Sequence, residues 1–433
     1  MARIGKTIET LKSVKAQWMK TMPDGMRGPV GPGGGMQGLP GMQGLPGMQG
    51  LPGMQGAGGL DLSGMMPGQA GERGAGRLRE IAEFGDNPGN LRLFAHVPDS
   101  LEASPALVVI LHGCKQTAAG YDLGTGWSEL AAREGFILCA PEQKRENNPN
   151  NCFSWFQAPD IARDRGEAAS IRAMVEHLAA QHGVDRSRIF VTGLSAGGAM
   201  TSVMLSTYPE IFAAGAVIAG LPYGVATSVH AAFDSMARGD SRTPQEAAEA
   251  VRAASGHAGP WPRLSVWHGT GDHTVTHDNS GAVVAQWAHL MGLHASPLRQ
   301  ETVDGHARRV WAGQDGSEVI EEYVIEGLGH GAPLAAGPGD TQFGEPGPFL
   351  LEAGISSTWR IAQFWGLVAS ERHEAAVTPV RADAAAGAST EAASPGESAH
   401  AGMARGLMDS LKPMLSTDVQ ETIRKSLHKA GLL

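Results

Sequence analysis

The stretch that decides the fold is Ile189-Phe190-Val191-Thr192-Gly193-Leu194-Ser195-Ala196-Gly197-Gly198. It begins as a short apolar strand, passes through a Gly-x-Ser-x-Gly turn and continues into an alanine-rich segment with the composition of a helix. A serine on such a tight strand-to-helix turn stands exposed above the sheet, and only small residues two positions before and after it avoid crowding. The stretch therefore predicts a parallel sheet with flanking helices, and Ser195 as an exposed nucleophile.

Residues 78–370 alternate strand patterns with helical patterns, which is typical of a mostly parallel sheet covered by helices on both faces. We therefore expect an α/β fold over this range, and with its Gly-x-Ser-x-Gly turn the chain resembles the α/β-hydrolases. The expected strands are Leu91–Val97, Ala106–Leu111, Phe136–Ala140, Arg188–Thr192, Ala213–Ala219, Leu264–His268 and Val319–Ile325. The expected helices are Arg165–His182, Ala196–Tyr208, Gly281–Met291 and Gly354–Trp365.

A serine hydroxyl is a weak nucleophile unless a histidine takes its proton and a carboxylate holds that histidine in place. In α/β-hydrolases the three groups follow one another along the chain as serine, acid and histidine. Asp272 follows the strand that ends at His268, and His330 stands between glycines after the last predicted strand. We therefore expect Asp272 and His330 to be the catalytic partners of Ser195. The alternatives are Asp278 and Asp304 for the acid, and His257, His268, His273, His277 and His306 for the base.

Acyl transfer also requires N–H donors that face the oxyanion of the tetrahedral intermediate. One expected donor is the backbone N–H of Ala196, the residue after the nucleophile. The other should come from the loop that begins with His112 after an early strand, where either Gly113 or Cys114 is the donor.

A second loop, Asn148–Phe156, follows the strand that ends at Ala140 and carries amides, a cysteine and aromatic residues. Loops at the carboxyl edge of such a sheet build substrate clefts. Candidate substrate-binding residues are Asn151, Phe153 and Trp155 in this loop, together with His112. The alternative is that the aromatic side chains simply pack the loop against the body.

Three cysteines exclude a disulfide-dense scaffold, and without a Cys-x-x-Cys pair we expect no cysteine-built zinc site. Cys114 and Cys152 are the candidate disulfide across the cleft, and whether they are bridged stays open at this point. The residues imply neither a metal nor an organic cofactor. With 34 basic against 44 acidic residues, nucleic acid is not an expected partner. No apolar run approaches the roughly 18 residues that a membrane span needs.

The two ends of the chain differ in composition from the body. Residues 1–24 predict a basic amphipathic helix, residues 371–404 predict a disordered linker, and residues 405–433 predict a second amphipathic helix. Residues 25–77 are rich in glycine, and from Gly35 to Gly56 every third residue is glycine, as in collagen. We expect this Gly-x-y segment to be either a self-associating stalk or a flexible linker. The terminal helices are expected to contact a hydrophobic granule or membrane surface, or to dock on protein.

Together, the motifs of residues 78–370 resemble the polyhydroxybutyrate depolymerase family of serine esterases, which also contains feruloyl and acetylxylan esterases. The motifs are Leu111-His112-Gly113-Cys114-x-Gln116, Pro141-Glu142-Gln143, Asn151-Cys152-Phe153-Ser154-Trp155-Phe156, Gly193–Gly198, Trp267-His268-Gly269-Thr270-x-Asp272 and Gly329-His330-Gly331. Residues 354–358, Gly-Ile-Ser-Ser-Thr, fit the branch that acts on short-chain polyhydroxyalkanoates. The resemblance implies a triad of Ser195, Asp272 and His330, and a polyester or small ester as substrate.

The resemblance also bears on location, because it suggests an extracellular protein. Residues 1–22 lack the apolar core of about 7–15 residues that an ordinary secretory signal peptide contains. Export by another route and a cytoplasmic location both stay open. The Gly-x-y segment does not belong to the pattern of this family.

Overall fold

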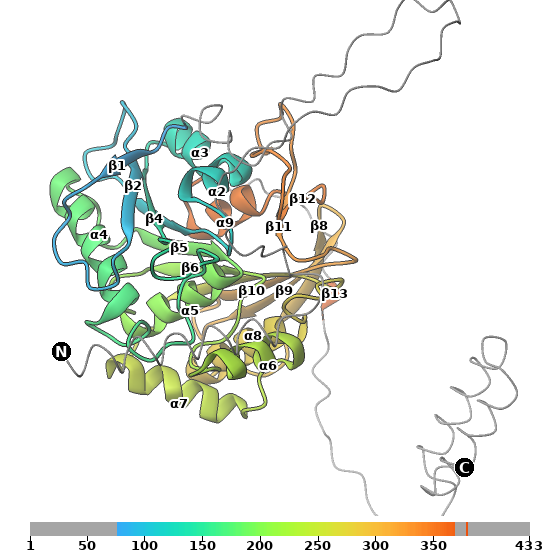
Figure 1. Cartoon of the computed structure of the whole chain (residues 1–433). Helices are drawn as coiled ribbons and strands as arrows, with labels where there is room; N and C mark the ends of the chain where they lie inside the picture. The colour runs from blue at the N-terminus through green and yellow to red at the C-terminus, as the bar shows by residue number, and fades with distance from the viewer. Residues whose placement is uncertain (1–75, 369–377, 380–433) are drawn as a thin grey trace, which may run out of the picture. The chain divides into compact units, whose positions relative to one another are not determined.

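The computed structural model describes residues 76–368 and 378–379. An eleven-stranded sheet, in the order β1-β2-β4-β3-β5-β6-β7-β10-β9-β8-β13, forms its centre (Figure 1). The strands are β1 (Arg79–Ile81), β2 (Arg92–His96), β3 (Leu107–Leu111), β4 (Ile137–Glu142), β5 (Ile189–Leu194), β6 (Ala214–Ile218), β7 (Arg263–Gly269), β8 (Arg299–Val303), β9 (His306–Ala312), β10 (Glu318–Ile325) and β13 (Thr378–Pro379). From β4 to β10 neighbouring strands run parallel, while both edges of the sheet are antiparallel. The predicted mostly parallel sheet is thus confirmed, and all seven predicted strands are present.

Eight helices cover the two faces of this sheet within the described residues. They are α2 (Ala118–Thr125), α3 (Trp127–Glu134), α4 (Gly166–His182), α5 (Ala196–Thr207), α6 (Val229–Arg238), α7 (Pro244–Ser255), α8 (Asp278–Leu290) and α9 (Ser357–Trp365). Figure 1 shows α2, α3 and α9 above the sheet, and α5 to α8 below it.

The central strands carry apolar side chains on both faces, so each strand contributes to two cores. In β3, Leu107, Val109 and Leu111 point into one core, while Val108 and Ile110 point into the other. The first core contains buried side chains of α4, α5, α7 and α8, and the second contains those of α2, α3 and α9. A strand buried on both faces is a continuous apolar run, which is why the sequence identifies it readily.

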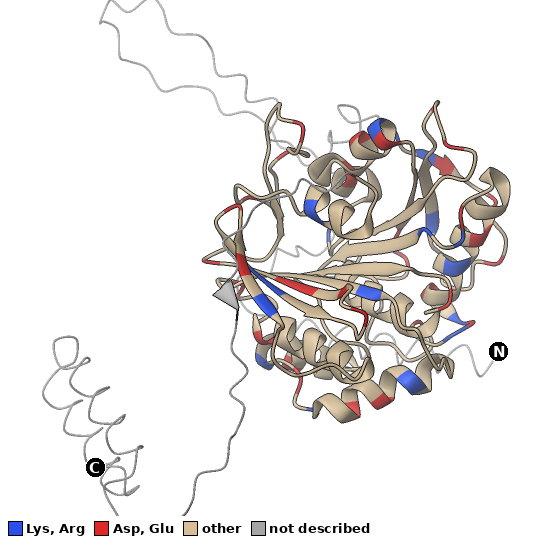
Figure 2. Cartoon of the chain, turned by 180° about the vertical axis from the view of Figure 1, so that it is seen from behind, with Lys and Arg blue, Asp and Glu red and all other residues tan. Residues whose placement is uncertain are grey.

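Strands β10, β9 and β8, toward the β13 edge of the sheet, are joined by charge pairs as well as by apolar packing. Arg308 on β9 pairs with Glu301 on β8 and with Glu318 and Glu321 on β10, and Arg309 pairs with Glu322. In the view of Figure 2, blue and red segments lie side by side on neighbouring strands of the sheet. Because the side chains of Glu321 and Glu322 are almost fully buried, the arginines supply the charge that burial of two carboxylates requires.

Two short strands lie outside the main sheet. β11 (Ala332–Leu334) and β12 (Leu350–Glu352) pair in parallel and carry the segments that follow His330 and Phe349. The sequence did not predict this pair.

Most of the predicted extensions lie outside the described residues: the helix of residues 1–24, the helix of residues 405–433, and the Gly-x-y segment apart from Gly76 and Arg77. Within the predicted linker of residues 371–404, Thr378–Pro379 pairs with β8 as strand β13. No helix of the described residues is long and apolar enough to cross a bilayer.

Candidate active site

The turn between β5 and α5 holds Ser195 in an unusual backbone conformation, with φ of 58° and ψ of −115°. Two glycines make this turn sterically accessible. A Cβ added to Gly193 would overlap with the carbonyl of Gly197, and one added to Gly197 would overlap with the carbonyl of Leu111. Both obstacles are backbone atoms, which cannot move aside as a flexible side chain can. The Gly-x-Ser-x-Gly pattern is therefore a packing requirement of the turn that presents the Ser195 hydroxyl.

A line of hydrogen bonds joins Ser195 to two residues from distant loops. His330 Nε2 lies 2.8 Å from Ser195 Oγ, and His330 Nδ1 lies 2.7 Å from Asp272 Oδ2. Because a carboxylate only accepts, Nδ1 carries the proton and Nε2 is free to accept one from the serine. This arrangement places the imidazole where it can deprotonate the hydroxyl.

The Asp272 carboxylate is saturated with donors. Its Oδ1 accepts the backbone N–H groups of Thr274 at 2.8 Å and Val275 at 2.9 Å. Its Oδ2 accepts from His330 and lies 3.3 Å from His268 Nε2. Burial alone would raise the pKa of Asp272, but the hydrogen bonds from His268 and His330 outweigh burial and hold the pKa well below its usual range. Asp272 therefore stays charged beside the imidazole.

His268 is a residue of this site that the sequence offered only as a rival base. Its buried Nε2–H donates to the carbonyl of Val275 at 2.9 Å while facing the Asp272 carboxylate. His268 thus helps to hold the Asp272 carboxylate in place. Its position four residues before Asp272, at the end of a strand, is a signal that could have identified it. Among the other rivals, Asp304 pairs with Arg360, and His306 Nε2 contacts the carbonyl of Ala353.

Two backbone N–H groups remain for an oxyanion. Ala196 is the first residue of α5, so its N–H has no acceptor within the helix. Of the two alternatives in the other loop, the N–H of Gly113 already donates to Gln116 Oε1 at 2.8 Å. The N–H of Cys114 donates to no acceptor among the described residues. Gly113 is therefore occupied, and the geometry favours Cys114.

The oxyanion loop is tied to the second predicted loop at two points. A disulfide joins Cys114 to Cys152, and the N–H of Lys115 donates to the carbonyl of Asn150 at 2.6 Å. The third cysteine, Cys139, is free and buried in β4. These links fix the position of the Cys114 N–H relative to the rest of the site.

The four predicted substrate-binding residues differ in how far they are buried. Phe153 and His112 are fully buried and their rings lie 4.9 Å apart, so neither offers a surface to a bound ester. Trp155 is also buried and packs edge-on against Phe156. The burial of Phe153 and Trp155 favours the alternative, in which the aromatic residues pack the loop against the body. Asn151 is half-buried, and its Oδ1 has no hydrogen-bond partner among the described residues.

Beneath this loop lies a buried polar network that the sequence did not reveal. Glu167 accepts from the backbone N–H of Ser154 at 2.7 Å and from Gln143 Nε2. The N–H of Gln143 in turn donates to His112 Nε2 at 3.1 Å, next to the oxyanion loop. Burial raises the pKa of Glu167 to about 7. The network thus joins α4 to both loops of the site.

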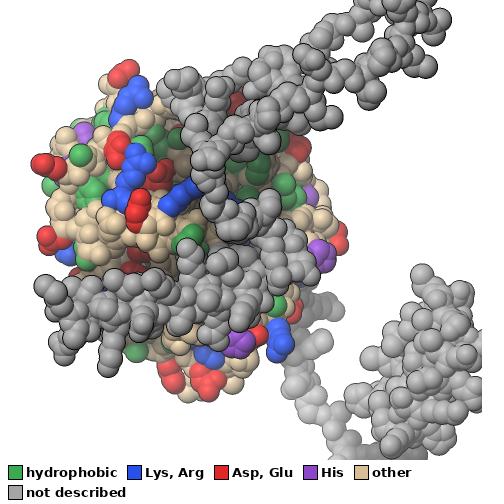
Figure 3. Space-filling view, viewed as in Figure 1, with side chains coloured by type: hydrophobic (Ala, Val, Ile, Leu, Met, Phe, Trp, Pro, Cys, Tyr) green, Lys and Arg blue, Asp and Glu red, His purple; other side chains and the backbone are tan. Residues whose placement is uncertain are grey.

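A hollow of about 680 Å³ lies beside Asn151, and its lining includes Arg92, Glu142, Lys144 and Glu146. Figure 3 shows mixed basic and acidic side chains on the left of the visible face, and green side chains toward the right. The hollow contains none of Ser195, Asp272 and His330 in its lining. Among the described residues, no group of three or more His, Cys, Asp or Glu side chains is arranged to hold a metal ion.

Comparison with known proteins gives concordant matches. The sequence model of the family described as esterase PHB depolymerase matches residues 92–310. The chain is 44% identical over 292 residues to poly(3-hydroxyalkanoate) depolymerase C of Paucimonas lemoignei, covering 67% of this chain and 70% of that protein. It is 34% identical over 268 residues to feruloyl esterase B of Talaromyces stipitatus, covering 60% and 73% of the two chains.

Among solved structures, an acetyl xylan esterase from Aspergillus awamori matches with a TM-score of 0.57 and 28% identity. The match covers 68% of this chain and 100% of that chain. The predicted α/β-hydrolase fold is confirmed.

Proposed function

Because this chain belongs to the esterase PHB depolymerase family of carboxylic ester hydrolases, we propose that it hydrolyses short-chain polyhydroxyalkanoate, or its oligomers, through an acyl-enzyme on Ser195. The observation that carries this proposal is the line of hydrogen bonds from Ser195 Oγ through His330 to Asp272. A nucleophile, a base and a group that orients the base are the parts that acyl transfer requires.

In the proposed reaction, His330 Nε2 accepts the proton of Ser195 while Oγ attacks the ester carbonyl. The N–H groups of Ala196 and Cys114 stabilise the oxyanion, and the charged Asp272 stabilises the imidazolium. The imidazolium then protonates the leaving alkoxide, which departs as an alcohol. Water attacks the acyl-enzyme by the same route, giving a carboxylic acid and free Ser195.

The choice of substrate rests on relatives. Identity to the poly(3-hydroxyalkanoate) depolymerase is 44%, against 34% for a feruloyl esterase and for an acetylxylan esterase. A polyester of 3-hydroxybutyrate, or its oligomers, is therefore the first candidate. Feruloyl or acetyl esters of carbohydrates are the second, supported by the TM-score of 0.57 to an acetyl xylan esterase.

The proposal is tested with p-nitrophenyl esters from acetate to octanoate, using wild type and Ser195→Ala, with fluorophosphonate labelling and peptide mapping. We expect the activity to vanish in the variant and the label to lie on Ser195. An unlabelled, inactive wild type would refute the esterase. Release of 3-hydroxybutyrate from amorphous polymer, compared with release of ferulate from its methyl ester, separates the two substrate classes.

We also propose that the terminal segments attach the enzyme to a hydrophobic granule or membrane surface, and that the Gly-x-y segment self-associates. The basic amphipathic pattern of residues 1–24 and the glycine period support these roles. Deleting residues 1–77 and 401–433 should abolish attachment and leave the rate on a soluble ester unchanged. Attachment that survives the deletion would contradict this role.

A further inference from the structure

Phe349 stands where a turn normally requires glycine. The N–H of Leu350 donates to the carbonyl of Gly347 at 3.0 Å, and the N–H of Gly347 donates to the carbonyl of Leu350 at 2.9 Å. Pro348 and Phe349 are therefore the two central residues of a tight turn. Phe349 has φ of 66°. Proline followed by a residue with positive φ is the pattern of a type II turn, whose second central position favours glycine or asparagine. A bulky side chain there costs free energy that glycine would not.

Packing does not explain the choice of phenylalanine. Phe349 keeps 36% of its surface exposed, and it is one of four large exposed hydrophobic side chains in the described residues. The other three are Leu123, Phe233 and Leu298. A strained aromatic residue that leaves more than a third of its surface exposed gains less from burial than a fully buried one, which points to a use for its side chain beyond packing.

The turn places the Phe349 ring against the reacting groups. The ring centroid lies 6.0 Å from that of His330, with the two planes at 75°. The carbonyl of Phe349 accepts the N–H of Ala332, two residues after His330, at 2.9 Å. On the other side, Gln116 Nε2 lies 3.4 Å from the carbonyl of Pro348. The turn is thus connected both to the segment after the base and to the oxyanion loop.

The strain at Phe349 belongs to a group of strained residues around the site. Eight residues other than glycine have positive φ in the described part of the chain, and four of them are Lys115, Asn151, Ser195 and Phe349. Lys115 and Asn151 each adjoin one cysteine of the disulfide. Strained backbone gathers where a side chain or N–H must be held in a functional position.

We propose that Phe349 is a specificity-determining residue whose exposed ring binds the apolar chain of the ester next to the carbonyl attacked by Ser195. The ligand class is an ester with apolar, methyl-bearing repeating units, so this inference rests on the proposed function and deepens it. Two exposed apolar residues accompany it. Pro348 adjoins the ring in the turn, and Leu123 on α2 precedes Gly124, whose carbonyl accepts the N–H of Glu345 in the same loop.

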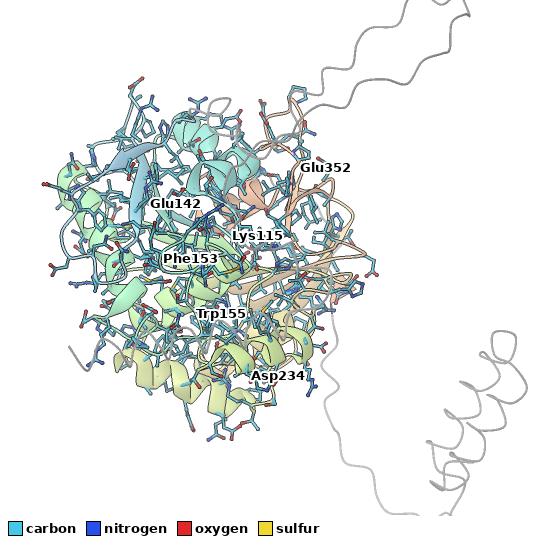
Figure 4. The ribbon with its side chains drawn as sticks, viewed as in Figure 1. Lys115, Glu142, Phe153, Trp155, Asp234 and Glu352 are labelled. Atoms are coloured by element: carbon cyan, nitrogen blue, oxygen red, sulfur yellow. A yellow bond between two sulfur atoms is a disulfide. The ribbon has the colours of Figure 1, made fainter. Side chains whose placement is uncertain are left out.

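The test uses two turn-compatible variants, Phe349→Gly and Phe349→Asn, because both residues adopt positive φ readily. The matched control is Phe233→Ala, which removes an aromatic ring with 44% exposure from helix α6. Figure 4 labels Asp234, the neighbour of Phe233, at the bottom of the view, well below Lys115 of the oxyanion loop and Glu352 at the end of β12. For each protein, kcat and KM are measured on the acetate, butyrate and octanoate esters, with thermal midpoints and 3-hydroxybutyrate release from amorphous polymer.

We expect both Phe349 variants to raise KM for the octanoate ester about tenfold and to change KM for acetate less than about threefold, because the longer chain covers more of the ring. Release of 3-hydroxybutyrate should fall about tenfold. Thermal midpoints should stay within about 3 °C of wild type, since losing the ring also relieves the turn. Phe233→Ala should match wild type in every rate.

Two results would overturn the inference. One is a chain-length profile that is the same in wild type and in both Phe349 variants. The other is a parallel loss on all esters together with a thermal midpoint lowered by more than about 8 °C in both, which would make Phe349 structural. Failure of the proposed function is a distinct result, because it appears as a Ser195→Ala protein as active as wild type.

Discussion

Replacing Asp272 with asparagine should reverse the hydrogen bonding of the whole line. One side of the carboxylate faces two backbone N–H groups, those of Thr274 and Val275, which can only donate. An asparagine must therefore direct its carbonyl to that side and its NH₂ toward His330. The imidazole would then accept at Nδ1 and carry its proton on Nε2, where it can no longer accept from Ser195.

The magnitude follows from this wrong tautomer. Enzymes of this chemistry lose about 10⁴ in kcat when the acid becomes an amide, which corresponds to about 5.5 kcal/mol of barrier. The NH₂ group also faces the His268 N–H, so two donors oppose each other. We expect that clash to lower the free energy of unfolding by about 1–3 kcal/mol at neutral pH.

The assay is kcat and KM on p-nitrophenyl butyrate, together with urea unfolding at several pH values. The matched control is Asp304→Asn, which removes a carboxylate from a surface pair with Arg360 and should leave kcat unchanged. Since the folded-state pKa of Asp272 is depressed, its stabilisation is complete above about pH 4, and the stability gap to the variant should narrow as pH falls below that. A kcat within about tenfold of wild type would refute the assigned role of Asp272.

Three further predictions concern the frame of the site. Replacing both Cys114 and Cys152 with serine should lower the free energy of unfolding by about 2–4 kcal/mol. It should also lower kcat with little change in KM, because the Cys114 N–H that faces the oxyanion is held less firmly. An unchanged kcat would contradict this. Gly197→Ala should abolish activity by displacing the elbow, whereas Gly281→Ala in α8, where an added Cβ meets nothing within 4 Å, should stabilise by about 0.5–1 kcal/mol; equal effects would refute the steric argument. The folded protein retains the Glu167 proton that the unfolded chain releases above pH 4.5, because burial raises the pKa of this group to about 7. The free energy of unfolding should therefore fall as pH rises from about 5 to 8. In Glu167→Gln, the free energy of unfolding measured with urea should change less over the same pH range.

The central strands that the sequence predicted most directly are buried along their whole length. In β3 and β5 this burial makes the apolar runs visible in the sequence. β8 and β9 were not predicted, because their side chains alternate charge with partial exposure. They pair through Arg308 and Glu301, and that pairing depends on a neighbouring strand rather than on a local pattern.

The site was predictable where its chemistry is local. The order of Ser195, Asp272 and His330, each after a strand, was legible because parallel strands end at one edge of a sheet. The choice between Gly113 and Cys114 was not, since it depends on Gln116 folding back to occupy one N–H. The role of the aromatic residues in the second loop could not be predicted either, because an aromatic side chain is equally suited to a cleft and to a core.

The sequence by itself determined the turn that presents Ser195, because glycines at fixed spacing are a local steric requirement of that backbone. It also determined the apolar runs of the central strands and the places of Asp272 and His330 after two of them. Only the tertiary structure decided which side chains surround them. His268 lies beside Asp272, and the Phe349 ring beside His330, because separate loops converge at one edge of the sheet. Such contacts join residues that are distant along the chain, so they cannot be predicted from a periodic pattern in the sequence.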